Sequence, residues 1–402
     1  VHFRLLHEKD QVPVKQAMVN PETDDVVAQS EAQYAYVTED HDWVVLDEED
    51  FGKGVLAPMF IGINLNKRSI AMDLKHEDAR KTLEPLIAQA DVVVENFRPG
   101  VIGRLGFDYE RVSAIKPDII YCSISGYGQE GPRATDAAYD GAVQAASGLM
   151  ASNGHEQTGP TRTVSPIIDV TTGLMAALAI SSALHRRSVT GEGQHIDVAM
   201  LDSAVTLLNP MFNIYLSTGA EPELLGNQSI AKLPTCNVFP TRDSYIQVTA
   251  LTEDQTAKMC AAMACSHLLE EERFCTRSKL IANRDEMRAE LLPIFIRETT
   301  ATWLERLNDA GVPVAPVCTI PEVMADPQLA HRNLTTELAP HQSLGVERVA
   351  SVTTGFKTNK DGPRADRTAP LVGEHTEEVL TEYGFDREAI SRMHTSGLLP
   401  TT

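Results

Sequence analysis

The stretches Asp91-Val-Val-Val-Glu95 and Asp118-Ile-Ile-Tyr-Cys-Ser-Ile124 decide the expected fold of this 402-residue chain. Each is a short apolar run rich in β-branched residues, which is typical of strands buried in a parallel sheet. Over residues 79–90, just before the first run, apolar residues recur at helical spacing, although Pro85 is expected to kink or end that helix. This β-α-β rhythm predicts a parallel α/β sheet.

Residues 170–187 form a predicted helix that opens at Asp169 and closes on His185-Arg-Arg187, where cations suit the negative end of the helix dipole. Other expected elements are a turn and strand over 191–198, a helix over Leu201–Leu208, a passage into another domain over 215–235, a strand over Tyr245–Ala250 and helices over 254–310. The acidic, irregular first sixty residues contain one plausible strand, Trp43–Leu46.

The composition predicts a globular protein, since 43% of the residues are hydrophobic. The formal charge of -21, from 56 acidic and 35 basic side chains, argues against nucleic acid or anionic lipid as a partner. A polyanionic ligand would need a local basic patch.

Six scattered cysteines without a CxxC pair predict reduced thiols and a cytoplasmic location. The apolar stretch Leu174–Leu184 contains two serines and falls short of the ~20 residues that span a bilayer. The first residues lack the pattern of a secretory signal. We therefore expect no membrane segment and no encoded export.

Asp169, in Ser165-Pro-Ile-Ile-Asp-Val-Thr-Thr-Gly173, is the first chemical candidate. It can be an ordinary N-cap that accepts a hydrogen bond from the first turn of the helix. It can also be a nucleophile, because a carboxylate that attacks a thioester carbonyl leaves a mixed anhydride on the enzyme. Both roles are compatible.

The glycine-rich loop Ser125–Pro132 has neither the Walker spacing nor a GxGxxG match, so it carries no nucleotide fingerprint. Lys67, Arg68, Arg98 and Arg104 are candidates for holding phosphates in this acidic chain. The twelve histidines form no HExxH, and no Cys/His group has zinc spacing, so no metal site is expected. His155 and His195 are interpreted as ordinary residues, and no GxSxG serine elbow is present.

Several longer strings occur together and in order along residues 64–399. They are Leu65–Asp73, Val94–Gly100 with Leu105-Gly-Phe107, Ser125–Pro132, Ala138-Tyr-Asp140, Pro166–Gly173, Thr190–Gln194 with Asp197, Gly311–Pro316, Asp326-Pro327 and Leu371–Thr376. In this combination the chain resembles the class III CoA-transferase family, which holds formyl-CoA transferase, carnitine CoA-transferase and α-methylacyl-CoA racemase.

The resemblance implies a large Rossmann-like domain that is completed by the C-terminal part of the chain, a smaller α+β domain, and two chains interlocked as a homodimer. The corresponding ranges are 1–215, with residues 1–60 atypical, then 216–330 with its linkers, then 331–402. No cofactor is expected to be bound permanently, because coenzyme A is substrate and product. The implied partners are an acyl-CoA and a small carboxylic acid.

By the same match, Asp169 corresponds to the family's catalytic aspartate, which carries the acyl group and then CoA. The hydroxyl of Tyr139 is expected to bind the incoming carboxylate or the intermediate. The expected CoA contacts are Lys67, Arg68, Asn96, Phe97 and Arg104. Backbone amides at the start of the helix after Asp169 are expected to stabilise the oxyanions.

Two alternatives stay open. Family racemases carry His-Asp where this chain has Tyr139-Asp140, and a phenol is a poor general base at neutral pH, so Tyr139 favours the transferase. A non-catalytic CoA-binding relative is the other alternative, because residues 1–60 lack the strand, turn and helix with which family members begin.

Overall fold

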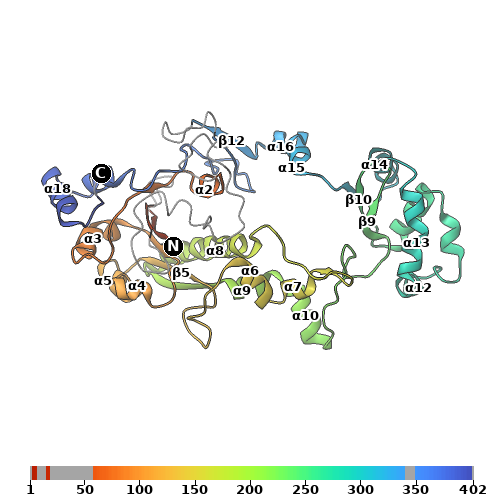
Figure 1. The fold of residues 1–402 in the computed structure, drawn as a ribbon, viewed down its shortest axis with the longest axis horizontal. Coiled ribbons are helices and arrows are strands. Elements are labelled where there is room, and N and C mark those ends of the chain that lie inside the picture. Colours follow the sequence, from red (N-terminus) through yellow and green to blue (C-terminus); the bar gives the residue numbers. More distant parts are fainter. Residues whose placement is uncertain (1, 7–14, 19–57, 340–348, 401–402) are drawn as a thin grey trace. The chain divides into compact units, whose positions relative to one another are not determined.

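The computed structural model describes residues 2–6, 15–18, 58–339 and 349–400, coloured along the sequence in Figure 1. The expected strand Trp43–Leu46 lies outside these ranges. Two compact units emerge from the contacts: unit 1 spans 1–147, 165–209 and 327–402, and unit 2 spans 148–164 and 210–326. Residues 148–164, which the sequence-based division places in the first domain, therefore cluster with the second unit.

A six-stranded sheet forms the centre of unit 1. In spatial order it contains β3 (Arg68–Ser69), β2 (Lys15–Met18), β1 (His2–Leu6), β4 (Val92–Glu95), β5 (Ile120–Ser125) and β8 (Gln194–Ala199). Strands β4, β5 and β8 run parallel, with Val94 beside Cys122 and Cys122 beside Ile196. The predicted parallel α/β sheet is confirmed for these strands, whereas β1 is antiparallel to both of its neighbours.

Helix α8 (Ile167–Thr190) covers one face of this sheet. Its Ile180 and Ala183 pack against the apolar side chains of Val92, Ile120 and Ile196, which alternate toward that face. Within the described parts of the chain, α8 is the one helix whose length and composition would also allow it to cross a membrane. The core helix of a soluble protein can meet the same two criteria, so length and composition alone do not identify α8 as a membrane span.

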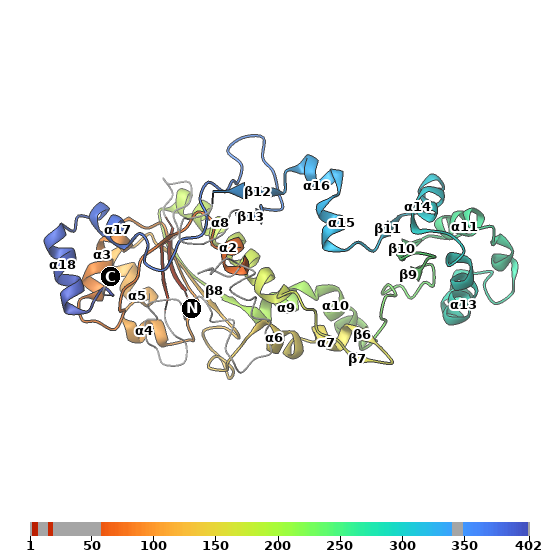
Figure 2. The ribbon, with the colours of Figure 1, turned by 45° about the horizontal axis from the view of Figure 1, so that its top comes forward.

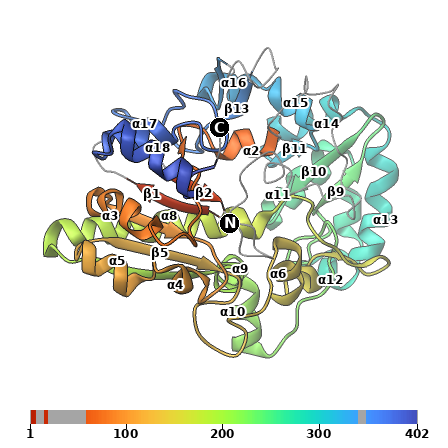
Figure 3. The ribbon, with the colours of Figure 1, turned by 60° about the vertical axis from the view of Figure 1, so that its left-hand side comes forward.

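The other face of the sheet is covered by α3 (Ala79–Gln89), α5 (Tyr109–Ile115) and the C-terminal helices α17 (Thr376–Glu382) and α18 (Arg387–Ser396). Leu83 and Tyr121 share a buried core with Val379 and Ile390. Figure 2 shows the blue C-terminal helices beside the orange α3, and Figure 3 shows α3, α4 (Val101–Leu105) and α5 around β5. The end of the chain thus completes the core of unit 1.

Pro85 lies inside α3, which continues to Gln89. The expectation that Pro85 could end the helix is therefore wrong, since the helix continues for four residues beyond it. Proline removes one helical hydrogen bond and costs about 3 kcal/mol. Burial of Leu83, Leu86 and Ile87 in the core of unit 1 offsets that loss.

Short elements complete unit 1. They are α2 (Pro58–Ile63), α4 (Val101–Leu105), α6 (Asp140–Ala146), α9 (Met200–Leu207), α16 (Pro327–Arg332), β12 (Thr335–Leu338) and β13 (Val349–Val352).

Unit 2 is built on an antiparallel sheet in the order β11 (Val314–Pro316), β10 (Tyr245–Thr249) and β9 (Cys236–Pro240). Its other elements are α7 (Leu149–Ser152), β6 (Gly154–His155), β7 (Gly159–Pro160), α10 (Asn209–Thr218, from the unit 1 boundary), α11 (Glu253–Ala262), the 3-10 helix η1 (Ser266–Glu270), α12 (Arg277–Ala282), α13 (Arg284–Phe295), α14 (Thr300–Asp309) and α15 (Ile320–Met324). Phe239 stacks on Phe295 with ring centroids 4.3 Å apart, and Trp303 Nε1 donates to the Phe295 carbonyl at 2.7 Å. This aromatic cluster organises a core separate from that of unit 1.

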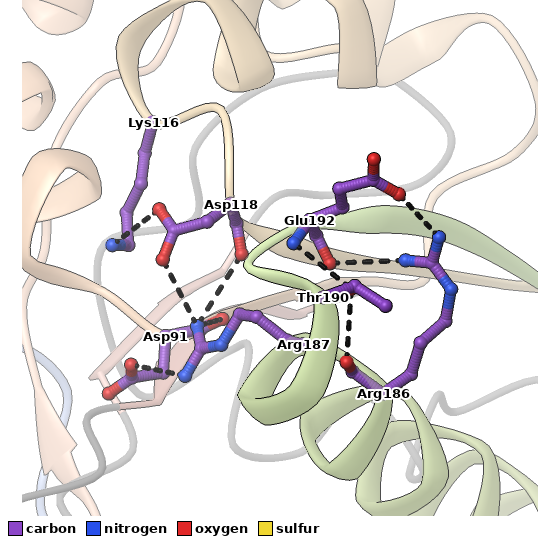
Figure 4. Close-up of polar contacts among 7 residues, drawn as sticks. All are labelled: Asp91, Lys116, Asp118, Arg186, Arg187, Thr190 and Glu192. Atoms are coloured by element: carbon purple, nitrogen blue, oxygen red, sulfur yellow. Dashed lines mark hydrogen bonds and ion pairs between the residues drawn. The ribbon is translucent and has the colours of Figure 1, made fainter.

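A charge network fastens the carboxyl end of α8 to the sheet (Figure 4). Arg187 Nη2 pairs with Asp91 Oδ1 at 2.8 Å, and Arg187 Nη1 donates to the carbonyl oxygens of Asp91 and Asp118 at 3.2 and 3.5 Å. The neighbouring Arg186 instead pairs with Glu192 in the turn that follows, at 2.6 Å. Because Asp91 and Asp118 precede β4 and β5, Arg187 joins the helix to the amino ends of both strands.

Candidate active site

Asp169 lies in the first turn of α8, two residues after the helix begins at Ile167. The N-cap position belongs to Pro166. The interpretation of Asp169 as the cap of its own helix is therefore wrong. Its carboxylate is left available for another role, and its residue is exposed to solvent in the single chain.

The cap of α8 comes from another helix. Asp140, the first residue of α6, is buried, and its Oδ2 accepts hydrogen bonds from the amides of Ile168 and Asp169 at 2.8 and 3.2 Å. The next amide, that of Val170, donates to the Pro166 carbonyl at 3.1 Å. These amides already have acceptors within the chain, and their contact with an oxyanion stays a prediction.

The pKa of the Asp169 carboxyl is raised to about 6. The surrounding protein removes part of its hydration, and the negative charge of Asp140 adds to the effect. Although the side chain still meets solvent, both causes disfavour its charged form. A carboxylate whose pKa is raised is a stronger base and nucleophile than an ordinary aspartate.

Tyr139 directly precedes Asp140 and occupies the N-cap position of α6. Its side chain is 74% exposed, so the phenol is open to a ligand. The buried Asp140 carboxylate thus connects the two residues that the sequence singles out: Tyr139 is its neighbour in the chain, and Asp169 donates its amide to it.

Two loops follow the carboxyl ends of neighbouring parallel strands, which is where open α/β sheets bind ligands. Asn96 follows β4, and its Nδ2 donates to the Ile124 carbonyl of β5 at 2.7 Å. The glycine-rich loop begins at Gly126, where an added Cβ would overlap the side chain of Ala138. The loop after β5 therefore packs against the segment that leads to Tyr139.

The residues predicted to contact CoA do not all present free groups. Lys67 Nζ donates to the Ile63 carbonyl and to Asn64 Oδ1, both at 2.7 Å. Arg68 is buried and pairs with Glu378 at 2.8 Å and Glu382 at 2.6 Å, and these carboxylates raise its pKa. Both cations hold unit 1 together here, and a phosphate contact by either one stays a prediction.

Phe97 is also internal: its ring is 3% exposed and joins the core of unit 1, and its amide donates to Glu95 Oε2 at 2.9 Å. Asn96 and Arg104 are exposed, and Arg104 lies in the last turn of α4. Of the five predicted CoA contacts, these two present their side chains to solvent. The role of all five in binding CoA remains a prediction.

The sequence did not reveal one polar cluster, which is formed by Glu95, Ser123 and His195. Ser123 Oγ lies 2.9 Å from His195 Nε2, and the His195 ring stacks on Tyr109 with centroids 5.2 Å apart. Burial raises the pKa of Glu95, which also bonds to Ser123, and burial lowers the pKa of His195. The strand register is the feature that indicates this cluster, since Glu95 and Ser123 are paired across β4 and β5.

Among the residues described, no group of three or more His, Cys, Asp or Glu side chains could hold a metal ion.

Comparison with known proteins identifies the family of this chain. Residues 49–376 match the model of CoA-transferase family III. The chain is 33% identical to human succinyl-CoA:glutarate CoA-transferase, over 86% of this chain and 78% of that protein. It is 36% identical to acetyl-CoA:oxalate CoA-transferase of Acetobacter aceti, over 68% and 71%.

A crystal structure of a CAIB/BAIF family protein from Brucella suis superposes with a TM-score of 0.73 at 33% identity, covering 82% of this chain and 84% of that one. The chain belongs to CoA-transferase family III. The resemblance inferred from the motifs is confirmed, and the protein is an enzyme of the acyl-CoA:carboxylate CoA-transferase class.

Proposed function

We propose that this enzyme moves CoA from an acyl-CoA to a free carboxylic acid through covalent intermediates on Asp169. The observation that carries the proposal is an exposed carboxylate in the first turn of α8 whose pKa is raised to about 6 and whose helix is capped by another residue. At neutral pH this carboxylate is mostly ionised and still more basic than an ordinary aspartate.

The proposed reaction uses only the acyl-CoA, the Asp169 carboxylate and the acceptor acid, and it consumes no water. An Asp169 Oδ attacks the thioester carbonyl, the C–S bond breaks, and CoA thiolate leaves behind a mixed anhydride. The thiolate attacks the aspartyl carbonyl and releases the donor acid, which leaves an aspartyl-CoA thioester. The acceptor carboxylate displaces the thiolate to form a second anhydride. The thiolate then attacks the acceptor carbonyl, which yields the new acyl-CoA and free Asp169.

Tyr139 is proposed to orient the acceptor. Its exposed phenol can donate a hydrogen bond to a carboxylate, and its backbone is tied to the start of α8 through Asp140. The relatives described above act, by name, on glutarate and oxalate. Both are small dicarboxylates, so we propose a small dicarboxylic acid as the acceptor.

The homodimer is likewise a proposal. On α8 the side chains of Val170, Leu174 and Leu178 are 55%, 67% and 63% exposed and recur every four residues, so they form one apolar stripe. We propose that a second copy of the chain covers this stripe. Light scattering after size exclusion is expected to give twice the chain mass, and Leu174→Glu with Leu178→Glu is expected to give the monomer. A monomeric wild-type protein at micromolar concentration would contradict the dimer.

Trapping tests the covalent mechanism. The protein is incubated with acetyl-, succinyl- and glutaryl-CoA, quenched with hydroxylamine, and digested for mass mapping of the peptide that contains Asp169. A hydroxamate on Asp169 is expected with the productive donor, and Asp169→Asn serves as the control that cannot form it. A wild-type enzyme that transfers CoA without any adduct would refute the covalent route. Exchange of the donor's α-proton without transfer would favour the racemase instead.

A further inference from the structure

We infer that Asp140 is a positioning residue of the proposed reaction: its buried carboxylate holds the first turn of α8 in place and sets a fixed negative charge beside Asp169. This inference rests on the proposed nucleophilic role of Asp169. It adds a residue to which neither the motifs nor the relatives' names assign a role.

The hydrogen bonds of Asp140 show how the position is fixed. Its Oδ2 receives the Ile168 and Asp169 amides, and its Oδ1 receives Gln144 Nε2 at 2.5 Å. Asp140 is 9% exposed and Gln144 is fully buried. Both carboxylate oxygens are thus held by donors that cannot easily shift, which makes the cap rigid.

The cap also joins two elements that carry the site. An N-cap within α8 would stabilise that helix and do nothing more. Asp140 instead begins α6 and follows Tyr139, so one carboxylate sets the placement of the nucleophile relative to the proposed acceptor-binding phenol. A displacement of 1 Å from the geometry of attack can cost about 100-fold in rate.

The charge of Asp140 acts on the reaction as well. In the described part of the molecule no Lys or Arg pairs with Asp140, and all three of its donors are neutral. The ionised Asp169 is therefore repelled by Asp140. The anhydride on Asp169 is uncharged, so the repulsion is relieved as the bond to the acyl group forms. An interaction that is less unfavourable in the transition state than in the ground state accelerates the step.

The other titratable groups on the elements packed against α8 do not produce this effect. On α9, Asp202 is exposed and is not among the causes that raise the Asp169 pKa. In β5, Cys122 faces α8, but burial raises its pKa and keeps the thiol neutral. The remaining titratable side chains of β5 and β8, namely Tyr121, His195 and Asp197, point to the opposite face of the sheet. Partial desolvation and Asp140 are the two causes that act on Asp169.

Two substitutions separate the cap from the charge. Asp140→Asn keeps a carbonyl oxygen that can accept the two amides but removes the charge, whereas Asp140→Ala removes both. Asp202→Asn on α9 is the matched control, since it removes a carboxylate that does not act on Asp169. The Asp169 carboxyl is titrated directly by NMR of protein labelled with ¹³C at Asp Cγ, and Asp169→Asn identifies its signal.

In Asp140→Asn the titration midpoint of Asp169 is expected to fall below about 6, and the acid limb of the pH–rate profile is expected to move to lower pH by the same amount. Asp140→Ala is expected to lower kcat by about 10- to 100-fold with a smaller change in KM. Asp202→Asn should match the wild type in both measurements.

An unchanged Asp169 midpoint in Asp140→Asn overturns the inference about charge, and wild-type kcat in a folded Asp140→Ala overturns the inference about position. If Asp140→Ala does not fold, the Asp140→Asn titration still decides the inference about charge. Gln144→Leu, which keeps the charge of Asp140 but removes the donor to its Oδ1, then decides the inference about position: a lowered kcat is expected, and a wild-type kcat overturns it. Because the titration needs no turnover, a lowered midpoint without a trapped adduct would refute the proposed function while leaving this electrostatic arrangement intact.

Discussion

At the carboxyl end of α8, Arg187 binds the carboxylate of Asp91 and the carbonyl oxygens of Asp91 and Asp118, whereas at the amino end Asp169 lies beside a second carboxylate. Both end residues suit the helix dipole, since the cation is in the last turn and the anion in the first. The surroundings differ, because opposite charges meet at one end and like charges at the other. One end therefore stabilises the fold, and the other keeps a carboxylate reactive at some cost in stability.

The largest expected effect is at the reactive end. Asp169→Asn should lower kcat/KM by at least about 1,000-fold, because the amide cannot form the anhydride. The same variant should be slightly more stable than the wild type at neutral pH. A raised carboxyl pKa means that folding favours the protonated form, so the cost of ionised Asp169 to folding grows from about pH 4 and is complete above about pH 6.

The gain in Tm of Asp169→Asn should therefore shrink as the pH falls from about 6 toward 4, because the cost of ionised Asp169 develops between the ordinary aspartate pKa of about 4 and the raised pKa of about 6. Thermal unfolding followed by circular dichroism at pH 4, 6 and 8 checks this trend. A variant less stable than the wild type at pH 8 would show that Asp169 contributes to the fold as well.

The stabilising end should respond in the opposite way. Arg187→Met removes the ion pair with the largely buried Asp91 carboxylate and should destabilise the folded state by about 3 kcal/mol. The rate per folded molecule should stay near that of the wild type, since Arg187 lies at the far end of the helix from Asp169. Urea unfolding and assays at low temperature measure the two quantities, and loss of rate without loss of stability would break the comparison.

The pH dependence tests the like-charge end without a mutation. The rate kcat/KM should fall tenfold per pH unit below about 6, because only ionised Asp169 attacks. A limb near pH 4 would mean that Asp169 titrates as an ordinary aspartate.

Tyr139→Phe should have a smaller effect, about 10-fold or less in kcat/KM for the acceptor acid, with little change for the acyl-CoA donor. The exposed phenol is proposed to donate one hydrogen bond, so the ring can remain in place without it. Initial rates with each substrate varied in turn separate the two constants. An equal loss for both substrates would place Tyr139 in the acylation step instead.

The smallest effect is expected at Arg186, which pairs with Glu192 on the surface next to Arg187. Arg186→Met should change the free energy of unfolding by less than about 0.5 kcal/mol, because exposed ion pairs gain little in water. It is the matched control for Arg187→Met in the same unfolding experiments. Equal losses for the two variants would mean that burial does not distinguish them.

Much of the fold was predictable where local pattern and burial agree. The strands expected at 91–95 and 118–124 are β4 and β5, and the helix expected over 170–187 is α8, which begins three residues earlier. These predictions succeeded because an apolar face must repeat with the period of its own element. The short helix Leu201–Leu208 was recovered within one residue of α9 for the same reason.

The amino-acid sequence alone determined the family and the conspicuous aspartate, because both depend on residue types and their order. The tertiary structure decided which carboxylate caps α8, that Arg68 pairs with Glu378 and Glu382, and that Ser123 joins Glu95 to His195. Each of these contacts links groups that lie far apart along the chain. Hydrophobic periodicity shows which face of an element is buried, but it does not show which polar groups of distant elements come into contact there. Those contacts determine the electrostatic surroundings of Asp169.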